Sequence, residues 1–230
     1  PPFRHGPPFK ACNPVFGVRP PYPSFDHAEP KAPFRAEGGN VLHRSVEREE
    51  PNPTAHAGRA PGAKPCRESR VVKTRLIFPK DTNRHGTLFG GELMRDIDDV
   101  AAIAAMRHSR RQVVTASIDS IDFLRPIAQN DAVTLEAFVT WTGTTSMEVF
   151  VKVITEDMLS GEREVAATAF ATFVALDDAM CPAPVPPVYP ETEEERLLYD
   201  GAPERVAERK RRKEKSRAFA RLFEIGRRDG

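Results

Sequence analysis

An aspartate on a predicted helix, preceded by a pair of glycines, is the arrangement in this chain best suited to chemistry. Gly90 and Gly91 stand where the helix would begin, and Asp98 follows about two turns later. Glycine has no side chain, so a substrate can approach the unpaired N–H groups of the first turn, which favour an oxygen that carries negative charge. A carboxylate beside such a site can serve as a general base or as a nucleophile.

The helix itself is predicted from Glu92 onward, because glycine and proline disappear and apolar residues recur in every turn. A helical projection gives it a polar flank made of Glu92, Arg95, Asp96 and Asp99. Asp98 falls outside this flank, at a seam where its neighbours are Gly91, Met94, Ala101, Ala102 and Ala105. Small and apolar neighbours would partly desolvate its carboxylate, as at many functional sites. The alternative is that Asp98 only pairs with Arg95, one turn earlier.

Composition predicts how the chain is divided. Its 230 residues are 40% hydrophobic, which is enough for a core, and a net charge of +1 gives no general reason to expect a polyanionic partner. Fourteen of the 22 prolines lie in residues 1–65. We therefore expect a disordered proline-rich leader, an ordered domain, a proline-rich linker and a charged helical tail, at residues 1–66, 70–180, 181–190 and 191–226.

Several classes of protein are not indicated. No stretch reaches the roughly 20 apolar residues of a membrane helix, and the leading segment has no signal-peptide core, so we expect a cytoplasmic protein. The cysteines and histidines are scattered without metal-ligand spacing, and we expect no metal.

The domain is predicted to combine this helix with several strands. Apolar and polar residues alternate over residues 70–78, 113–123, 132–141, 146–155 and 165–176. One long helix among antiparallel strands indicates the α+β class. The last strand is rich in Ala and Phe on both faces, so we expect a helix to cover one face and a neighbouring subunit the other.

The tail is predicted to contain two helices. Thr192 with Glu195 fits a capping box, and Pro203 suits the first turn of a second helix. The basic run at 209–213 is interleaved with glutamates, which is typical of a solvated helix, although a phosphate or nucleic-acid patch is the alternative. A short apolar stripe that we expect to dock on a subunit consists of Phe219, Leu222 and Phe223.

Several motifs between residues 71 and 177, taken together, resemble the hot-dog-fold acyl-CoA thioesterases. They are Asn83, Gly86, the run Leu88-Phe89-Gly90-Gly91, Asp98 with the alanine-rich helix after it, Val114 to Asp119, Phe123 to Pro126 with Asp131, and Thr144 to Met147. The resemblance implies a hot-dog fold, in which a five- or six-stranded antiparallel sheet wraps around the central helix. It also implies a homodimer with joined sheets, often assembled into a hexamer.

The activity implied by the resemblance is hydrolysis of acyl-CoA to a free fatty acid and coenzyme A, with no cofactor, nucleic acid or membrane involved. Each site would lie between subunits, where Asn83 and Asp98 act together. Gly90 and Gly91 are the candidates for binding the carbonyl oxygen. The segments that resemble coenzyme A contacts of the family are Thr115, Ala116 and Ser117, and Thr144, Thr145 and Ser146. The resemblance departs at Glu92, where relatives often carry an apolar residue.

Two alternatives from other classes stay open. A hot-dog hydratase or dehydratase would pair a catalytic histidine with a carboxylate near the helix, but His108 lies at the wrong end and nothing orients His85. A non-enzymatic acyl-CoA sensor that regulates transcription would need a DNA-reading element, for which only the basic tail is available.

Overall fold

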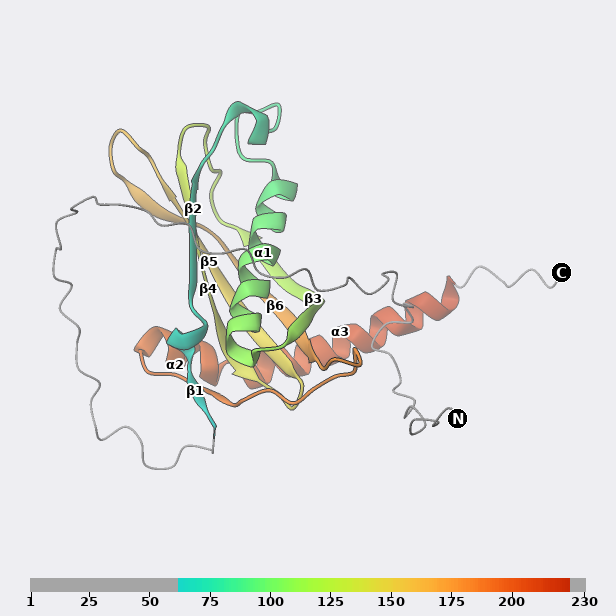
Figure 1. Cartoon of the computed structure of the whole chain (residues 1–230). Coiled ribbons are helices and arrows are strands. Elements are labelled where there is room, and N and C mark those ends of the chain that lie inside the picture. Colours follow the sequence, from blue (N-terminus) through green and yellow to red (C-terminus); the bar gives the residue numbers. More distant parts are fainter. Residues whose placement is uncertain (1–61, 224–230) are drawn as a thin grey trace, which may run out of the picture. The chain divides into compact units, whose positions relative to one another are not determined.

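A five-stranded antiparallel sheet wraps around one long helix in the computed structural model, which describes residues 62–223 (Figure 1). The helix is α1 (Gly90–Ser109). In their order across the sheet, the strands are β2 (Val71–Leu76), β4 (Ala132–Thr142), β5 (Ser146–Glu156), β6 (Arg163–Leu176) and β3 (Gln112–Phe123). The predicted α+β class is confirmed. Most of the predicted leader, residues 1–61, lies outside the described residues.

The core lies between α1 and one face of the sheet. Alternate residues of the central strands point into it and are fully buried, among them Val133, Leu135, Ala137 and Val139 of β4 and Met147, Val149, Val151 and Val153 of β5. Burial of one such side chain contributes roughly 1.5–3 kcal/mol. Together these contacts fix the rotation of α1, because Leu93, Ile97 and Val100 must face the sheet. Asp98 is thereby held at the edge of the buried face, half-buried.

The helix begins two residues earlier than predicted, at Gly90 rather than Glu92. Phe89 precedes it in extended conformation, and its carbonyl oxygen accepts hydrogen bonds from the N–H groups of Glu92 and Leu93. The two glycines therefore form the first turn itself instead of leading into it. Their N–H groups are those that a helix cannot satisfy internally.

Asp96, on the predicted polar flank of α1, is paired within the fold and is not exposed to solvent. Its side chain is buried and accepts hydrogen bonds from Lys73 Nζ and Arg75 Nε, both at 2.8 Å. Burial alone would raise the pKa of this carboxyl, but the bonds from Lys73 and Arg75 outweigh it and lower the pKa. The periodicity of α1 could not reveal these partners, because both come from β2.

The C-terminal helices lie against the other face of the sheet, near one end of its strands (Figure 1). α2 (Glu193–Asp200) begins with the predicted capping box of Thr192 and Glu195, and α3 (Ala202–Leu222) has proline in its first turn. The guanidinium of Arg205 lies 4.3 Å from the centre of the Phe170 ring on β6. This chain's own helix therefore contacts the second face of β6, and a neighbouring subunit on that face stays a prediction.

Arginines, not the apolar stripe, attach α3 to the sheet. Arg205 and Arg209 pair with Glu148, which is fully buried, and Arg209 and Arg212 pair with Asp119. We expected the basic run at 209–213 to be solvated, but its Arg209 and Arg212 contact the sheet. The stripe residues are exposed in this chain, and their docking on another subunit stays a prediction: Phe219, Leu222 and Phe223.

Short segments from the two ends of the domain pair with each other. β1 (Lys64–Pro65) pairs in parallel with β7 (Val188–Tyr189), and the 3-10 helix η2 (Cys66–Ser69) packs its fully buried Cys66 into the core. The leader was predicted to extend to residue 66, but the first strand of the structure already begins at Lys64. A second 3-10 helix, η3 (Pro79–Asp81), precedes the loop to α1. Over residues 62–223, no helix is long and apolar enough to span a membrane.

Candidate active site

The first turn of α1 presents two N–H groups that have no hydrogen-bond partner within the described part of the chain, those of Gly90 and Gly91. A side chain at residue 91 would collide with the Phe89 ring, because a Cβ atom built there lies 2.5 Å from Phe89 Cε1. At residue 90 the nearest atom is Phe123 Cζ at 3.7 Å, an ordinary contact. A side chain at residue 91 would therefore have to displace the exposed ring of Phe89. The turn can donate to an oxygen that develops negative charge.

Asp98 lies further along the same helix and faces β3. Its Oδ1 accepts a hydrogen bond of 2.9 Å from the Thr115 hydroxyl. Arg95, the partner expected in the alternative interpretation, pairs instead with Glu92. The Thr115 bond restricts the orientation of the Asp98 side chain. Asp98 is therefore equipped to accept a proton or to attack a carbonyl carbon.

Asn83 organises the loop that leads into α1. Its Nδ2 donates to Thr87 Oγ1 at 2.9 Å, and its Oδ1 accepts from the His85 N–H at 2.8 Å. Gly86, with φ of 73°, allows the tight return of the chain at this point. Over residues 62–223, no hydrogen bond joins Asn83 to Asp98. One chain by itself does not bring the two predicted catalytic residues together.

The predicted coenzyme A contacts on β3 are divided between the two faces of the sheet. Thr115 pairs with Phe173 of β6 and Ser117 with Thr172, so Ala116 is the extra residue of a β-bulge. The bulge leaves Thr115 facing α1. The Ser117 hydroxyl donates instead to Asp119, on the side of α3, at 2.7 Å.

The hairpin between β4 and β5 holds the remaining predicted contacts. The carbonyl of Thr144 accepts from the Val185 N–H, and that of Thr145 accepts from the Ala175 N–H, both at 3.0 Å. Ser146 is the first residue of β5, and its carbonyl accepts a hydrogen bond from the Gly143 N–H that closes the turn. The threonine side chains at 144 and 145 have no partner within the described residues. The hairpin thus lies beside the end of β6.

A cavity of about 300 Å³ opens at the start of α1. It is lined by Gly90 and Leu93 of the helix and by the segment that follows β3, from Phe123 to Ile127. This volume is at the lower end of the range for small-molecule sites. Its lining is largely apolar, so the cavity suits a short hydrocarbon group bound next to the N–H groups of Gly90 and Gly91.

The two histidines that we weighed as catalytic groups are placed differently. His85 is exposed and its ring approaches only Arg84. His108 is fully buried, with Nε2 bonded to the Pro186 carbonyl at 2.8 Å. Burial lowers the pKa of His108, although the Pro186 bond opposes the shift. His108 thus anchors the linker to α1 and does not face Asp98. The described residues contain no cluster that could hold a metal ion.

The sequence did not predict the hydrogen bond between Thr115 and Asp98. The signal available was the alternation of β3, which places Thr115 on one face, but that alternation is interrupted at Ala116. Thr115 was identified only as a coenzyme A contact. The structure adds to it a direct role in holding Asp98.

Known proteins were compared with this chain. The family model of the thioesterase superfamily matches residues 85–162. An uncharacterised acyl-CoA thioester hydrolase of Bacillus subtilis is 63% identical over 155 residues, which cover 67% of this chain and 90% of the relative.

Solved structures give the same result. An acyl-CoA hydrolase from Staphylococcus aureus, in complex with butyryl coenzyme A, coenzyme A and coenzyme A disulfide, is 47% identical with a TM-score of 0.68, covering 70% of this chain and 98% of its own. An apo-hexameric acyl-CoA thioesterase is 50% identical with a TM-score of 0.64, and the match covers 65% of this chain and 96% of the thioesterase chain. Structures of the S. aureus enzyme also include alanine variants of an asparagine, an aspartate and a threonine. Their spacing along that chain is the spacing of Asn83, Asp98 and Thr115 in this one.

Proposed function

The chain belongs to the acyl-CoA thioester hydrolases of the thioesterase superfamily and has their hot-dog fold, and from this membership we propose how it hydrolyses acyl-CoA to a fatty acid and coenzyme A. The observation that carries the proposal is the position of Asp98. Its carboxylate is held by Thr115 on the helix whose first turn offers the unpaired N–H groups of Gly90 and Gly91. An oxygen base or nucleophile and donors for an oxyanion are the two requirements of thioester hydrolysis.

The reaction begins with the thioester carbonyl oxygen at the start of α1. The Gly91 N–H, with Gly90 beside it, donates to this oxygen as negative charge develops on it. Asp98 either takes a proton from a water that attacks the carbonyl carbon or attacks that carbon itself. The carbon–sulfur bond then breaks. In the first course the leaving thiolate takes the proton that Asp98 removed from the water. In the second course the acyl group stays on Asp98 as a mixed anhydride, which a water hydrolyses to the fatty acid and the free carboxylate, and a proton of that water goes to the thiolate. The proposed reaction needs no cofactor or metal, because the carboxylate and the helix N–H groups supply both functions.

Asn83 is proposed to act across a subunit interface. Inside one chain its amide is occupied by Thr87 and His85 and does not reach Asp98. A second copy can bring its own loop to the Asp98 of the first, where the amide would orient water or substrate. The matching spacing of residues replaced in the S. aureus enzyme supports assigning roles to Asn83, Asp98 and Thr115.

The acyl group is proposed to occupy the cavity at Gly90, Leu93 and Phe123. Gly90, which carries one of the N–H groups proposed to bind the carbonyl oxygen, lines this cavity, so an acyl chain there would hold the thioester near the first turn of α1. The volume of about 300 Å³ favours short chains. Glu92 stands at the same turn.

A homodimer is proposed as the smallest active unit, and a trimer of dimers as the full assembly. β3 is an edge strand of the sheet with Ile118 and Phe123 exposed. A long edge strand with apolar residues is a surface that soluble proteins normally pair or cover. The hexameric relative supports the larger assembly. A cytoplasmic location is part of the same proposal, and cell fractionation tests it.

Steady-state hydrolysis of acyl-CoA substrates from acetyl to palmitoyl, followed by release of the free thiol, tests the function. We expect turnover for at least the short chains and its loss in Asp98→Ala. Absence of thiol release with every substrate, from a folded oligomer, contradicts the proposal. Hydration of enoyl-CoA in the same samples would indicate the hydratase alternative, and salt-dependent DNA binding would indicate the sensor.

A further inference from the structure

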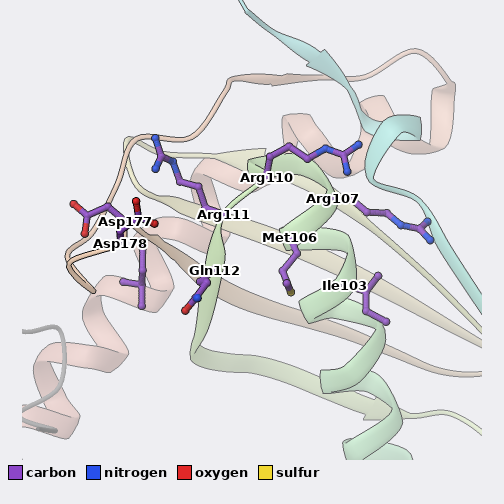
Figure 2. Close-up of a pocket in the computed structure, with 9 residues that line it drawn as sticks. Ile103, Met106, Arg107, Arg110, Arg111, Gln112, Asp177 and Asp178 are labelled. Atoms are coloured by element: carbon purple, nitrogen blue, oxygen red, sulfur yellow. The ribbon is translucent and has the colours of Figure 1, made fainter. Parts of the chain in front are cut away.

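β2 is bonded to α1 near both ends of the strand. At the C-terminal end of the helix, Arg107 extends toward the start of β2 (Figure 2), and its guanidinium donates to the Arg70 carbonyl. Further along the strand, Lys73 Nζ and Arg75 Nε donate to the buried Asp96 of α1, both at 2.8 Å. A segment that is bonded to this strand is therefore also fixed relative to α1.

Asp81 extends these contacts to the loop that carries Asn83. It is the last residue of η3 and is buried. Its Oδ2 accepts hydrogen bonds from Arg75 Nη1 at 3.0 Å and from the Phe78 N–H at 3.1 Å. The guanidinium of Arg75 thus joins two carboxylates, that of Asp81 before the loop and that of Asp96 on α1. An arginine suits this position, because its planar fork donates in several directions at once.

The backbone of Asp81 closes the base of the loop. Its carbonyl accepts from the Phe89 N–H at 2.9 Å, and inside the loop the Asn83 N–H donates to the Thr87 carbonyl at 2.8 Å. Residues 82–88 therefore fold back as a small hairpin, with Asp81 and Phe89 at its base and Asn83 two residues from it. Because the side chain of Asp81 fixes this base, it also fixes the position of Asn83 relative to the domain.

The hairpin is also attached to the loop after β3. The Gly86 carbonyl accepts from the Gln129 N–H at 3.1 Å, and the Leu88 N–H donates to the Ile127 carbonyl at 2.8 Å. Both are bonds between backbone groups. Within the described residues, the side chain of Asn83 bonds only to residues of its own hairpin. The geometry of its amide therefore depends on how the hairpin as a whole is held.

We propose that Asp81, oriented by Arg75, is a positioning residue that holds Asn83 for the reaction in the site of a second copy. The inference rests on the proposed function, since it assumes that Asn83 acts across the interface. One chain then gives its Asn83 to one site and its Asp98 to the other. Asp81 supports only the site that receives Asn83, although Arg75 connects it to the helix that carries Asp98. Asp81 takes no part in the chemistry.

The first test is Asp81→Asn, which keeps the volume and one oxygen of the side chain but removes the charge that faces Arg75. With butyryl-CoA as substrate, we expect kcat to fall about tenfold and KM to change less than about twofold, because a charged bond that orients a group of the site is lost. The matched control is Asp157→Asn. Asp157 also accepts from backbone N–H groups in a turn, those of Leu159 and Ser160 at 2.8 Å, but this turn carries no residue of the proposed site. The control should keep the kcat of wild type, and equal losses in the two variants would contradict the proposal.

Mixed dimers give a readout that a general loss of stability would not give. Asp81→Asn co-refolded with Asp98→Ala leaves one site with an intact hairpin and an intact Asp98, so activity should rise to about a quarter of wild type. Co-refolding with Asn83→Ala yields no such site, and activity should stay at or below that of Asp81→Asn alone. Recovery with Asn83→Ala would overturn the proposal. Recovery with neither partner, where Asn83→Ala and Asp98→Ala do complement each other, would overturn it as well.

Arg75→Lys tests the same contact from β2 and decides the question if Asp81→Asn does not fold. A lysine ammonium lacks the fork that spans both carboxylates, and Asp96 keeps its bond from Lys73, so the loss falls on Asp81. This variant should recover activity with Asp98→Ala and not with Asn83→Ala. The reverse pairing would show that Arg75 acts on the reaction through α1 and not through the hairpin.

Hydrogen exchange separates this inference from the proposed function, because it needs no turnover. In Asp81→Asn the N–H groups of Asn83 and Phe89 should exchange at least about tenfold faster than in wild type, while that of Val100 in α1 should not change. If Asn83→Ala and Asp98→Ala fail to complement each other, the shared site is wrong, but faster exchange in the hairpin still supports the positioning role of Asp81. Hairpin exchange that is equal in wild type and variant contradicts that role even if the wild type hydrolyses acyl-CoA normally.

Discussion

The Thr115 hydroxyl donates a hydrogen bond of 2.9 Å to Asp98 Oδ1 and so joins the edge strand β3 to the central helix. Thr115→Val, which keeps the shape and removes the donor, should lower kcat about tenfold or more, because a bond to a charged group is lost. Thr115→Ser retains the hydroxyl and should restore most of the activity. If valine and serine variants turn over equally, Thr115 does not orient Asp98.

Replacement of the carboxylate itself should have a larger effect. Asp98→Asn should reduce turnover by about 10²-fold or more with an unchanged melting temperature, since a positioned base or nucleophile is removed. Asp99→Asn is the matched control, because Asp99 is exposed and its nearest charged partner, Lys73 Nζ, lies 3.6 Å away. Equal losses in the two variants would show that the face of α1 has been misassigned.

Sharing of the site between subunits can be tested by complementation. Asn83→Ala and Asp98→Ala should each be nearly inactive alone. Co-refolding equal amounts gives mixed dimers in half of the cases, each with one complete site of two, so activity should return to about a quarter of wild type. Mass spectrometry must establish that subunits exchange. Exchange without recovery would place Asn83 and Asp98 of the same chain in one site.

The periodicity of apolar residues in the sequence predicts where the strands lie but not which residues of other elements they contact. Alternation predicted the ends of the five strands of the main sheet to within two residues, because inward residues such as Val133 and Val149 must be buried. The same logic did not reveal that Asp96 is buried, since its burial depends on Lys73 and Arg75 from another strand. A pattern within one element does not show which partner another element supplies.

The tail illustrates the same limit. Charge patterning predicted a helix correctly but read its arginines as solvated. Their partners, Glu148 and Asp119, lie on strands far away in sequence. The separation of Asn83 from Asp98 within one chain was likewise beyond single-chain patterns, because only the resemblance suggested an interface.

The buried ion pair between Arg205 and Glu148 should dominate the attachment of α3. Arg205 Nη2 lies 2.7 Å from Oε1 of a fully buried carboxylate. Arg205→Met would leave that charge without its main partner, and the free energy of unfolding should fall by about 3 kcal/mol. Arg217→Met, on the exposed part of the same helix, should change it by less than about 0.5 kcal/mol. Denaturant titration measures both, and similar values would contradict the role of the pair.

Stability should decline in mild acid because of His108. Burial lowers the pKa of its imidazole, so below pH of about 6.5 the unfolded chain binds a proton that the folded chain does not. The free energy of unfolding should therefore fall as pH drops from 7 toward the lowered pKa. His108→Gln should be less stable at pH 7 but should show a shallower dependence between about pH 5 and 7. An unchanged slope in the variant would assign the acid sensitivity to other groups.

The β-bulge at Ala116 has a consequence for how this strand tolerates change in length. It allows two hydroxyls only two positions apart to serve opposite sides of the sheet, Thr115 toward α1 and Ser117 toward Asp119. A deletion of Ala116 would make the two residues neighbours, and neighbouring residues of a regular strand also face opposite sides, so both hydroxyls should keep their partners. A strand that kept Ala116 but lost the bulge would instead place both hydroxyls on one side, and either Asp98 or the anchorage of α3 would lose its contact.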